Sequence, residues 1–154
     1  MSPRRRYPPL ITSSVAKQIL EGKGRISLDL GLTLESVQLL KEVAILPDGA
    51  AVNIDDLKKI EDRENAIFSP DGRSLRMVAV SDGHFYKLVP TGGAPTLEVN
   101  GVRMHRTKDT SPEVDATDKI ETLGIRDGDV LDSCTGLGYT AQAAAERGAD
   151  LVVS

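Results

Sequence analysis

The chain has 154 residues, of which 40% are hydrophobic and 27% charged, and its formal net charge is −4. This balance predicts a folded protein and argues against a general affinity for nucleic acid. A single cysteine, Cys134, excludes an internal disulfide. No apolar run approaches the roughly 20 residues that a membrane helix needs, and no apolar segment of a signal peptide follows the basic N-terminus. We therefore expect a cytoplasmic protein with no membrane partner.

Residues 1–9 form a basic arm that contains Arg4-Arg5-Arg6 and Pro8-Pro9. A solvated, extended tail is the simpler interpretation, and a contact with nucleic acid is the alternative.

Residues 10–106 predict a small α+β domain that is rich in antiparallel hairpins. The expected elements are a helix over about 13–21 capped by Thr12 or Ser13, a strand over 25–30, further strand over 36–46, and a helix from Asn53 to near Asp62. Asp71-Gly72 and Asp82-Gly83 mark turns between apolar runs. Asn100-Gly101 predicts a type I′ hairpin turn that pairs Val99 with Val102 and Glu98 with Arg103.

Residues 107–154 predict a linker helix followed by a strand, a helix and a second strand. Ser111-Pro112 is typical of a helix start, and this helix should end at Gly124. The strand 129–132, a helix from about Tyr139 to Arg147 and a strand from Leu151 then form one β-α-β unit.

The loop of this unit carries Gly136 and Gly138 in the stretch VLDSCTGLGYTA. No lysine follows Gly138, so triphosphate binding is disfavoured. A dinucleotide loop places its first glycine almost directly after the strand, whereas here Asp132 and three further residues intervene. A carboxylate at this point would repel a pyrophosphate and attract an ammonium or hydroxyl group. The spacing therefore favours S-adenosylmethionine, which has a zwitterionic amino-acid end and no phosphate.

The stretch 130–141 resembles motif I of the class I S-adenosylmethionine-dependent methyltransferases. Together with Ala94–Val99, Met104–Arg106 and Asp115–Lys119, it resembles a family of predicted archaeal methyltransferases. The resemblance implies a Rossmann-like α/β domain behind the small α+β domain, and transfer of a methyl group to an acceptor that the sequence does not name. The residues that it implies in cofactor binding are Asp132, Thr135, Gly136, Leu137, Gly138, Tyr139 and Thr140.

The remaining candidates lie before and inside the loop. His105 and Arg106 are candidate substrate or lid residues, and an exposed strand end is the alternative. Cys134 is expected to be a small buried filler and not a nucleophile. His84 and His105 do not have the spacing of a metal site, so no metal is expected.

The chain ends at Ser154, before the further strands that a methyltransferase sheet requires. We therefore expect an N-terminal, truncated segment that binds the cofactor weakly or not at all, with its catalytic residues beyond Ser154. A neighbouring chain or an oligomer is expected to cover the incomplete sheet.

Two other functions remain open. The first is an aminopropyltransferase-like enzyme of the same fold, which uses decarboxylated cofactor. The second is a non-enzymatic module that binds RNA or a protein partner, in which the glycine loop is vestigial.

Overall fold

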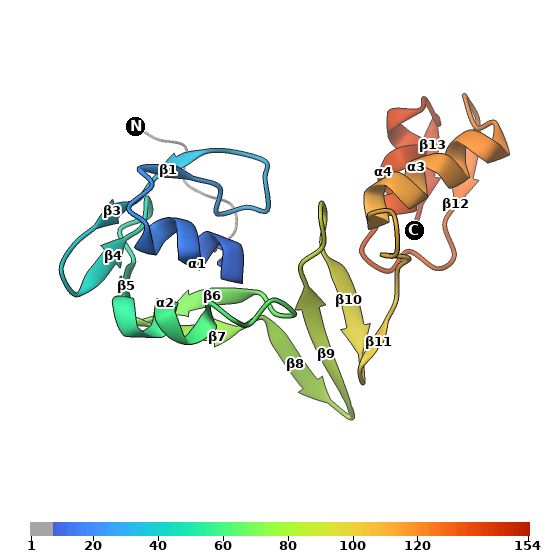
Figure 1. Cartoon of the computed structure of the whole chain (residues 1–154). Helices are drawn as coiled ribbons and strands as arrows, with labels where there is room; N and C mark the ends of the chain where they lie inside the picture. The colour runs from blue at the N-terminus through green and yellow to red at the C-terminus, as the bar shows by residue number, and fades with distance from the viewer. Residues whose placement is uncertain (1–7) are drawn as a thin grey trace. The chain divides into compact units, whose positions relative to one another are not determined.

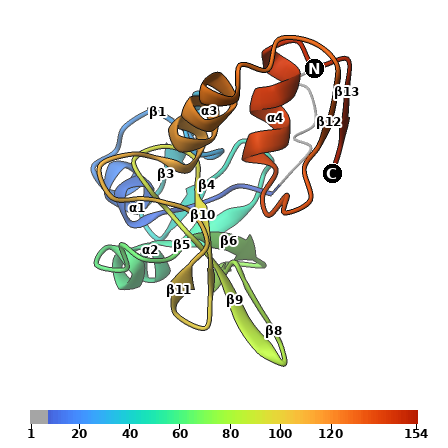
Figure 2. The ribbon, with the colours of Figure 1, turned by 90° about the vertical axis from the view of Figure 1, so that its right-hand side faces the viewer.

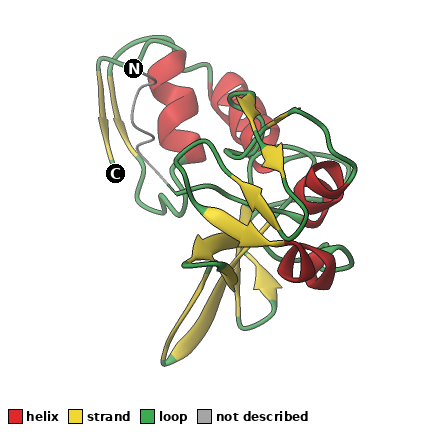
Figure 3. Ribbon diagram, turned by 90° about the vertical axis from the view of Figure 1, so that its left-hand side faces the viewer, coloured by secondary structure: helices red, strands yellow, loops and turns green. Residues whose placement is uncertain are grey.

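A computed structural model describes residues 8–154 (Figure 1). Arg4–Arg6, and with them most of the predicted basic arm, lie outside the described residues. Chain contacts divide the protein into two compact units, one reaching to Ser81 together with Lys87–Pro90, the other comprising Asp82–Tyr86 and Thr91–Ser154. Each unit has its own hydrophobic core. Within the described residues the fold is a mixed α+β arrangement of four helices and several small sheets (Figure 3).

Helix α1 (Ser13–Leu20) opens the first unit, as the sequence predicts. The Thr12 side chain accepts a hydrogen bond from the Val15 amide at 3.2 Å and so satisfies one of the unpaired N–H groups at the helix start. Ala16 and Ile19 are buried in the core of the unit.

Strand β1 (Arg25–Ile26) is much shorter than the predicted strand over 25–30, and the prediction is therefore wrong for residues 27–30. Side chains replace the strand ladder there: the Gly31 amide donates to Ser27 Oγ at 2.7 Å, and the Thr33 amide donates to Asp29 Oδ1 at 2.9 Å. Leu30 has a φ of +60°, which ends the extended conformation.

The predicted continuous strand over 36–46 is also wrong. The chain instead forms β2 (Glu35–Ser36), β3 (Gln38–Leu39) and β4 (Val43–Ile45). It reverses after β3, where the Leu40 amide donates to the Val43 carbonyl at 2.8 Å. The polar pair Lys41-Glu42 occupies this turn and interrupts the apolar pattern of residues 36–46.

The rest of the first unit follows the predicted order. β2 pairs with β1, and β5 (Ala51–Asn53) completes an antiparallel sheet of order β3-β4-β5. Helix α2 (Ile54–Ile60) begins directly after Asn53, although the Asn53 side chain makes no capping hydrogen bond. β6 (Phe68–Asp71) and β7 (Ser74–Met77) form the predicted antiparallel hairpin.

A four-stranded sheet of order β11-β10-β9-β8 contains the points at which the chain passes between the units. Its strands are β8 (Ala79–Asp82), β9 (His84–Val89), β10 (Thr96–Val99) and β11 (Val102–Arg103). The predicted pairs Glu98–Arg103 and Val99–Val102 are confirmed, and the turn residues Asn100 and Gly101 both have positive φ. The sequence groups this hairpin with residues 10–106, whereas the contacts group it with the C-terminal segment.

The C-terminal elements are those that the sequence predicts. Helix α3 (Pro112–Leu123) ends at Gly124, whose φ is +69°. β12 (Asp129–Leu131), α4 (Tyr139–Glu146) and β13 (Leu151–Val153) follow, and the two strands pair in parallel (Figure 2). Within the described residues, parallel pairing is confined to these two strands, so this part of the chain contains no Rossmann sheet.

One face of the β12–β13 pair is covered and the other is not. Ala116 and Ile120 of α3 pack with Ala143 and Ala144 of α4, and the strand residues facing them belong to the same core. On the opposite face, the side chains of Leu131 and Val153 are 75% and 50% exposed. Parallel strands are normally buried on both faces, so an exposed apolar face is unusual for a parallel pair.

Within residues 8–154, no helix is both long enough and apolar enough to cross a lipid bilayer.

Gly148, which follows α4, packs closely against the main chain of Arg126, and a substitution there tests this contact. Its φ is +105°, and a Cβ atom added there would lie 2.8 Å from the Arg126 carbonyl oxygen. We predict that Gly148→Ala lowers the free energy of unfolding by about 1–3 kcal/mol, measured by urea denaturation. Gly92→Ala is the matched control, because Gly92 has no positive φ and its Cβ would meet nothing within 4 Å. Equal stability of the two variants would contradict the packing described here.

Candidate functional site

The loop between β12 and α4 depends on its two glycines. Gly136 and Gly138 have φ values of +56° and +83°, a region that other residues rarely adopt. The Gly138 amide donates to the Thr135 carbonyl at 2.7 Å, which tightens the loop directly before the first turn of α4. The glycines at the predicted positions therefore bring the end of the strand and the start of the helix together.

Asp132 ties the two ends of this loop together. Its amide donates to the Val153 carbonyl at 2.8 Å, and its carboxylate oxygen Oδ2 accepts the Thr140 hydroxyl at 2.7 Å. The Thr135 hydroxyl donates to the Asp132 carbonyl at 2.9 Å. The sequence predicts that both Asp132 and Thr140 face the cofactor, and the structure shows that they also bind each other. Because a carboxylate has about four acceptor positions, Asp132 keeps acceptor capacity for a ligand.

Cys134 is exposed, and the prediction of a buried filler is therefore wrong. The residue lies in the turn that carries the chain away from β12, and this turn is not packed between the strand and α4. Its amide makes a long hydrogen bond of 3.4 Å to Asp132 Oδ1.

His105 lies against the glycine loop. A Cβ atom added to Gly136 would be 3.6 Å from His105 Nε2, an ordinary van der Waals distance, so the ring lies directly beside the loop. His105 Nδ1 is 3.0 Å from the hydroxyl oxygen of Thr96, which is fully buried. The ring also meets Tyr139 edge-on, with 5.2 Å between ring centroids. Two candidate regions that the sequence names separately therefore lie together.

Tyr139 anchors this arrangement. Its hydroxyl donates to the Pro95 carbonyl at 2.7 Å, so the start of α4 is joined to the residue before β10. Burial raises the pKa of the phenol, and the nearby Glu113 carboxylate raises it further. Its hydroxyl already has a main-chain partner, so a role of Tyr139 in cofactor binding would involve its ring. The sequence singles out Ala94–Val99 but assigns it no role, and this anchor supplies one.

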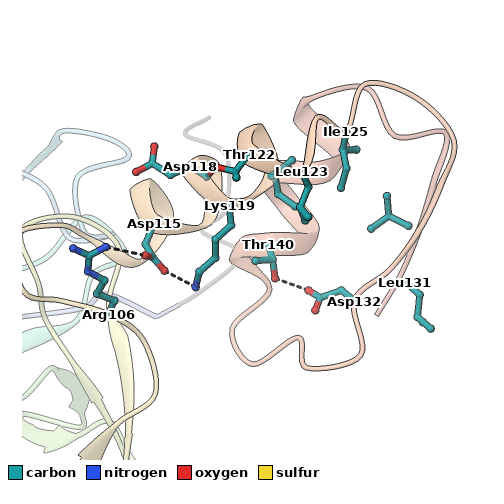
Figure 4. Close-up of a pocket in the computed structure, with 12 residues that line it drawn as sticks. Arg106, Asp115, Asp118, Lys119, Thr122, Leu123, Ile125, Leu131, Asp132 and Thr140 are labelled. Carbon is teal, nitrogen blue, oxygen red and sulfur yellow. Dashed lines mark hydrogen bonds and ion pairs between the residues drawn. The ribbon is translucent and has the colours of Figure 1, made fainter.

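Arg106 points to a different neighbour. Its Nη1 atom is 3.8 Å from Asp115, which also pairs with Lys119 at 2.6 Å (Figure 4). These three charged residues line one part of a cavity of about 660 Å³, of which α3 and β12 form the walls. Of the cofactor-binding residues that the resemblance implies, Asp132 and Thr140 line the cavity. Arg106 was predicted as a substrate or lid residue, whereas Asp115 and Lys119 appeared only as part of the resemblance and were not predicted as site residues.

The surroundings of His105 favour the neutral form of its imidazole, because they lower its pKa. Burial is the main cause of its lowered pKa, the positive charge of Lys119 lowers the pKa further, and Asp115 offsets part of this effect. A neutral imidazole offers one hydrogen-bond donor and one acceptor, whereas the protonated ring offers two donors. Because Nδ1 is paired with Thr96, the neutral ring presents only Nε2 to the loop, as either a donor or an acceptor.

No family model matches the chain. The chain is 42% identical over 151 residues to the uncharacterized protein MJ1233 of Methanocaldococcus jannaschii. The match covers 92% of this chain and 51% of that protein, so the chain spans about half the length of this curated relative.

The environment of His105 predicts that the stability of the folded chain depends on pH. Because the folded protein lowers the pKa of His105, the unfolded chain binds its proton more readily. The contribution of neutral His105 to the free energy of unfolding is therefore fully present above about pH 6.5, the ordinary pKa of histidine. It is lost as the pH falls through the lower pKa of His105 in the folded protein. An NMR titration should give a midpoint for His105 below 6.5, and Lys119→Met should raise it. A wild-type midpoint above 6.5 would contradict this description.

The bond between Asp132 and Thr140 predicts that Thr140→Val loosens the loop. We expect a loss of about 1 kcal/mol in local stability, seen as faster hydrogen exchange of the loop amides. Thr117→Val is the matched control, because the Thr117 hydroxyl only donates to the Glu113 carbonyl within an exposed part of α3. Loop exchange rates that are the same in both variants would show that this bond does not hold the loop.

Proposed function

We propose that this chain supplies the first β-α-β unit of an S-adenosylmethionine-dependent methyltransferase. The observation that carries the proposal is the position of Asp132, fixed at the end of a parallel strand beside a loop with two left-handed glycines. A carboxylate held there is suited to the ammonium group of the amino-acid end of the cofactor. The glycines allow the ligand to approach the main chain closely.

Phosphate-bearing nucleotides fit this site less well. In a dinucleotide loop, the pyrophosphate lies at the helix N-terminus, close to the end of the first strand. Asp132 occupies that end here, and the bond from Thr140 holds its carboxylate beside the first turn of α4. Bringing two phosphate charges next to this carboxylate would be unfavourable at short range. S-adenosylmethionine has a sulfonium and an ammonium group instead.

The proposed fold of the complete site is Rossmann-like. The parallel pairing of β12 and β13 through α4 and the bare apolar face of this pair both support it. Within such a site Asp132 would hold the ammonium group, and Thr140 would hold Asp132. The main chain of Thr135–Gly138 would line the methionine and ribose portions.

The proposed reaction transfers the sulfonium methyl group. A lone pair on the acceptor forms a bond to the methyl carbon as the carbon–sulfur bond breaks, which leaves S-adenosylhomocysteine. A proton on the acceptor, where present, passes to a base. Enzymes of this kind contribute mainly the alignment of the two reactants. Asp132 and the glycine loop would contribute by fixing the cofactor.

The proposal predicts weak but specific binding of S-adenosylhomocysteine to this chain. We expect a Kd on the order of 1 mM, which corresponds to about −4 kcal/mol. In an NMR titration, the shifted amides should be those of residues 132–140. NAD⁺ at the same concentration should leave them unchanged. Asp132→Asn keeps an acceptor for Thr140 but removes the charge, and it should weaken binding about tenfold.

Three results would count against the proposal. These are loop shifts with NAD⁺ that equal those with S-adenosylhomocysteine, an unperturbed loop at several millimolar S-adenosylhomocysteine, and unchanged affinity in Asp132→Asn. Asp129→Asn is a matched control, because Asp129 lies at the other end of β12 and should leave binding unchanged.

A further inference from the structure

We propose that His105 donates a hydrogen bond from Nε2 to the carboxylate of a ligand on the glycine loop, and that Thr96 is the positioning residue that aims this donor. The identity of the ligand rests on the proposed function, whereas the placement of the donor rests on the structure of the second unit alone.

The proton of the neutral imidazole is placed by the hydroxyl group of Thr96. The Thr96 hydroxyl lies 3.0 Å from His105 Nδ1 and 3.3 Å from the Leu97 carbonyl oxygen, and it can donate to only one of them. The contact with Nδ1 is the shorter of the two, and the Leu97 carbonyl already accepts the Met104 amide at 2.8 Å. The hydroxyl proton is therefore better used on Nδ1, which makes Nδ1 the acceptor and leaves the ring proton on Nε2.

The proton on His105 Nε2 points toward the glycine loop. Nε2 faces Gly136, and no protein acceptor for it is found in residues 8–154. The Nε2 proton is therefore available to a ligand that lies over the loop.

The imidazole ring of His105 is held rigidly. The Thr96 side chain is fully buried, and its oxygen also accepts the main-chain amide of His105 at 3.3 Å. The ring of Tyr139 packs edge-on against the imidazole, and the bond from Tyr139 to Pro95 fixes the Tyr139 ring in turn. The hairpin of β10 and β11 therefore carries a donor whose direction is set before a ligand arrives, which lowers the entropic cost of binding.

A carboxylate is the ligand group best suited to this donor. An N–H donor binds a carboxylate more strongly than a neutral hydroxyl, because the charge of the acceptor strengthens the hydrogen bond. The Asp132 carboxylate, held after β12 by the Thr140 hydroxyl, is suited to a positive group. The two ends of an α-amino acid thus find complementary groups, the carboxylate at His105 and the ammonium at Asp132.

The test compares two ligands that differ only at the amino-acid end. S-adenosylhomocysteine has this end, and 5′-methylthioadenosine lacks it. We expect His105→Leu to weaken S-adenosylhomocysteine binding about tenfold in an NMR titration, and to leave 5′-methylthioadenosine binding unchanged. His105→Gln keeps an N–H donor and should recover part of the loss.

The role of Thr96 is tested without any ligand. Nitrogen-15 NMR of the imidazole should show the Nε2–H tautomer in the wild-type chain and in Thr96→Ser, and a mixture of tautomers in Thr96→Val. Thr96→Val should also weaken S-adenosylhomocysteine binding, whereas Thr96→Ser should not. The amide spectrum of each variant shows whether that variant has kept its fold. Thr96→Ser is the control for a change of side chain at this buried position, because it keeps the hydroxyl group.

An Nδ1–H tautomer in the wild-type chain would overturn the inference, as would equal losses for both ligands in His105→Leu. If the wild-type chain binds neither ligand, the proposed function and the carboxylate contact both fail. The tautomer spectra then still decide whether Thr96 aims His105.

Discussion

The hydrogen bond from the Thr140 hydroxyl to the Asp132 carboxylate is the interaction on which the candidate site depends. It joins the end of β12 to the first turn of α4, and the loop between them is closed by this bond and by two glycines in left-handed conformations. The bond gives Asp132 a fixed direction before any ligand is bound. A charged group that is already oriented contributes more to binding than one that must first be ordered.

The same loop explains why the preceding hairpin belongs to the site. The ring of His105 lies beside Gly136 of the loop, and the contact extends to Thr96 and Tyr139. Segments that lie some forty residues apart in the sequence are thereby held in one unit, with the bond between Tyr139 and Pro95 as the link. The hairpin therefore lies against the loop and carries His105, the donor proposed for the site.

Features encoded within a few neighbouring residues were predictable. Thr12 at the start of α1, the Asn100-Gly101 turn and the Gly124 stop of α3 are local signals, and the structure contains all three. The prediction of a strand over 25–30 was wrong, because the alternation of apolar and polar residues does not reveal that the Ser27 and Asp29 side chains accept main-chain amides in place of a neighbouring strand. The contact of His105 with Gly136 was beyond the sequence, because it depends on how distant segments pack. The loop and Asp132 were visible as a motif, but their partners were not.

The ligand proposed for this loop has an amino-acid end that lies between Asp132 and His105. A crystal structure of the chain grown with saturating S-adenosylhomocysteine tests this placement most directly. We expect the ammonium group within hydrogen-bond distance of an Asp132 carboxylate oxygen and the ligand carboxylate within hydrogen-bond distance of His105 Nε2, with the ligand lying over Gly136. A ligand bound elsewhere on the chain, or one whose amino-acid end points away from both residues, would contradict the claim.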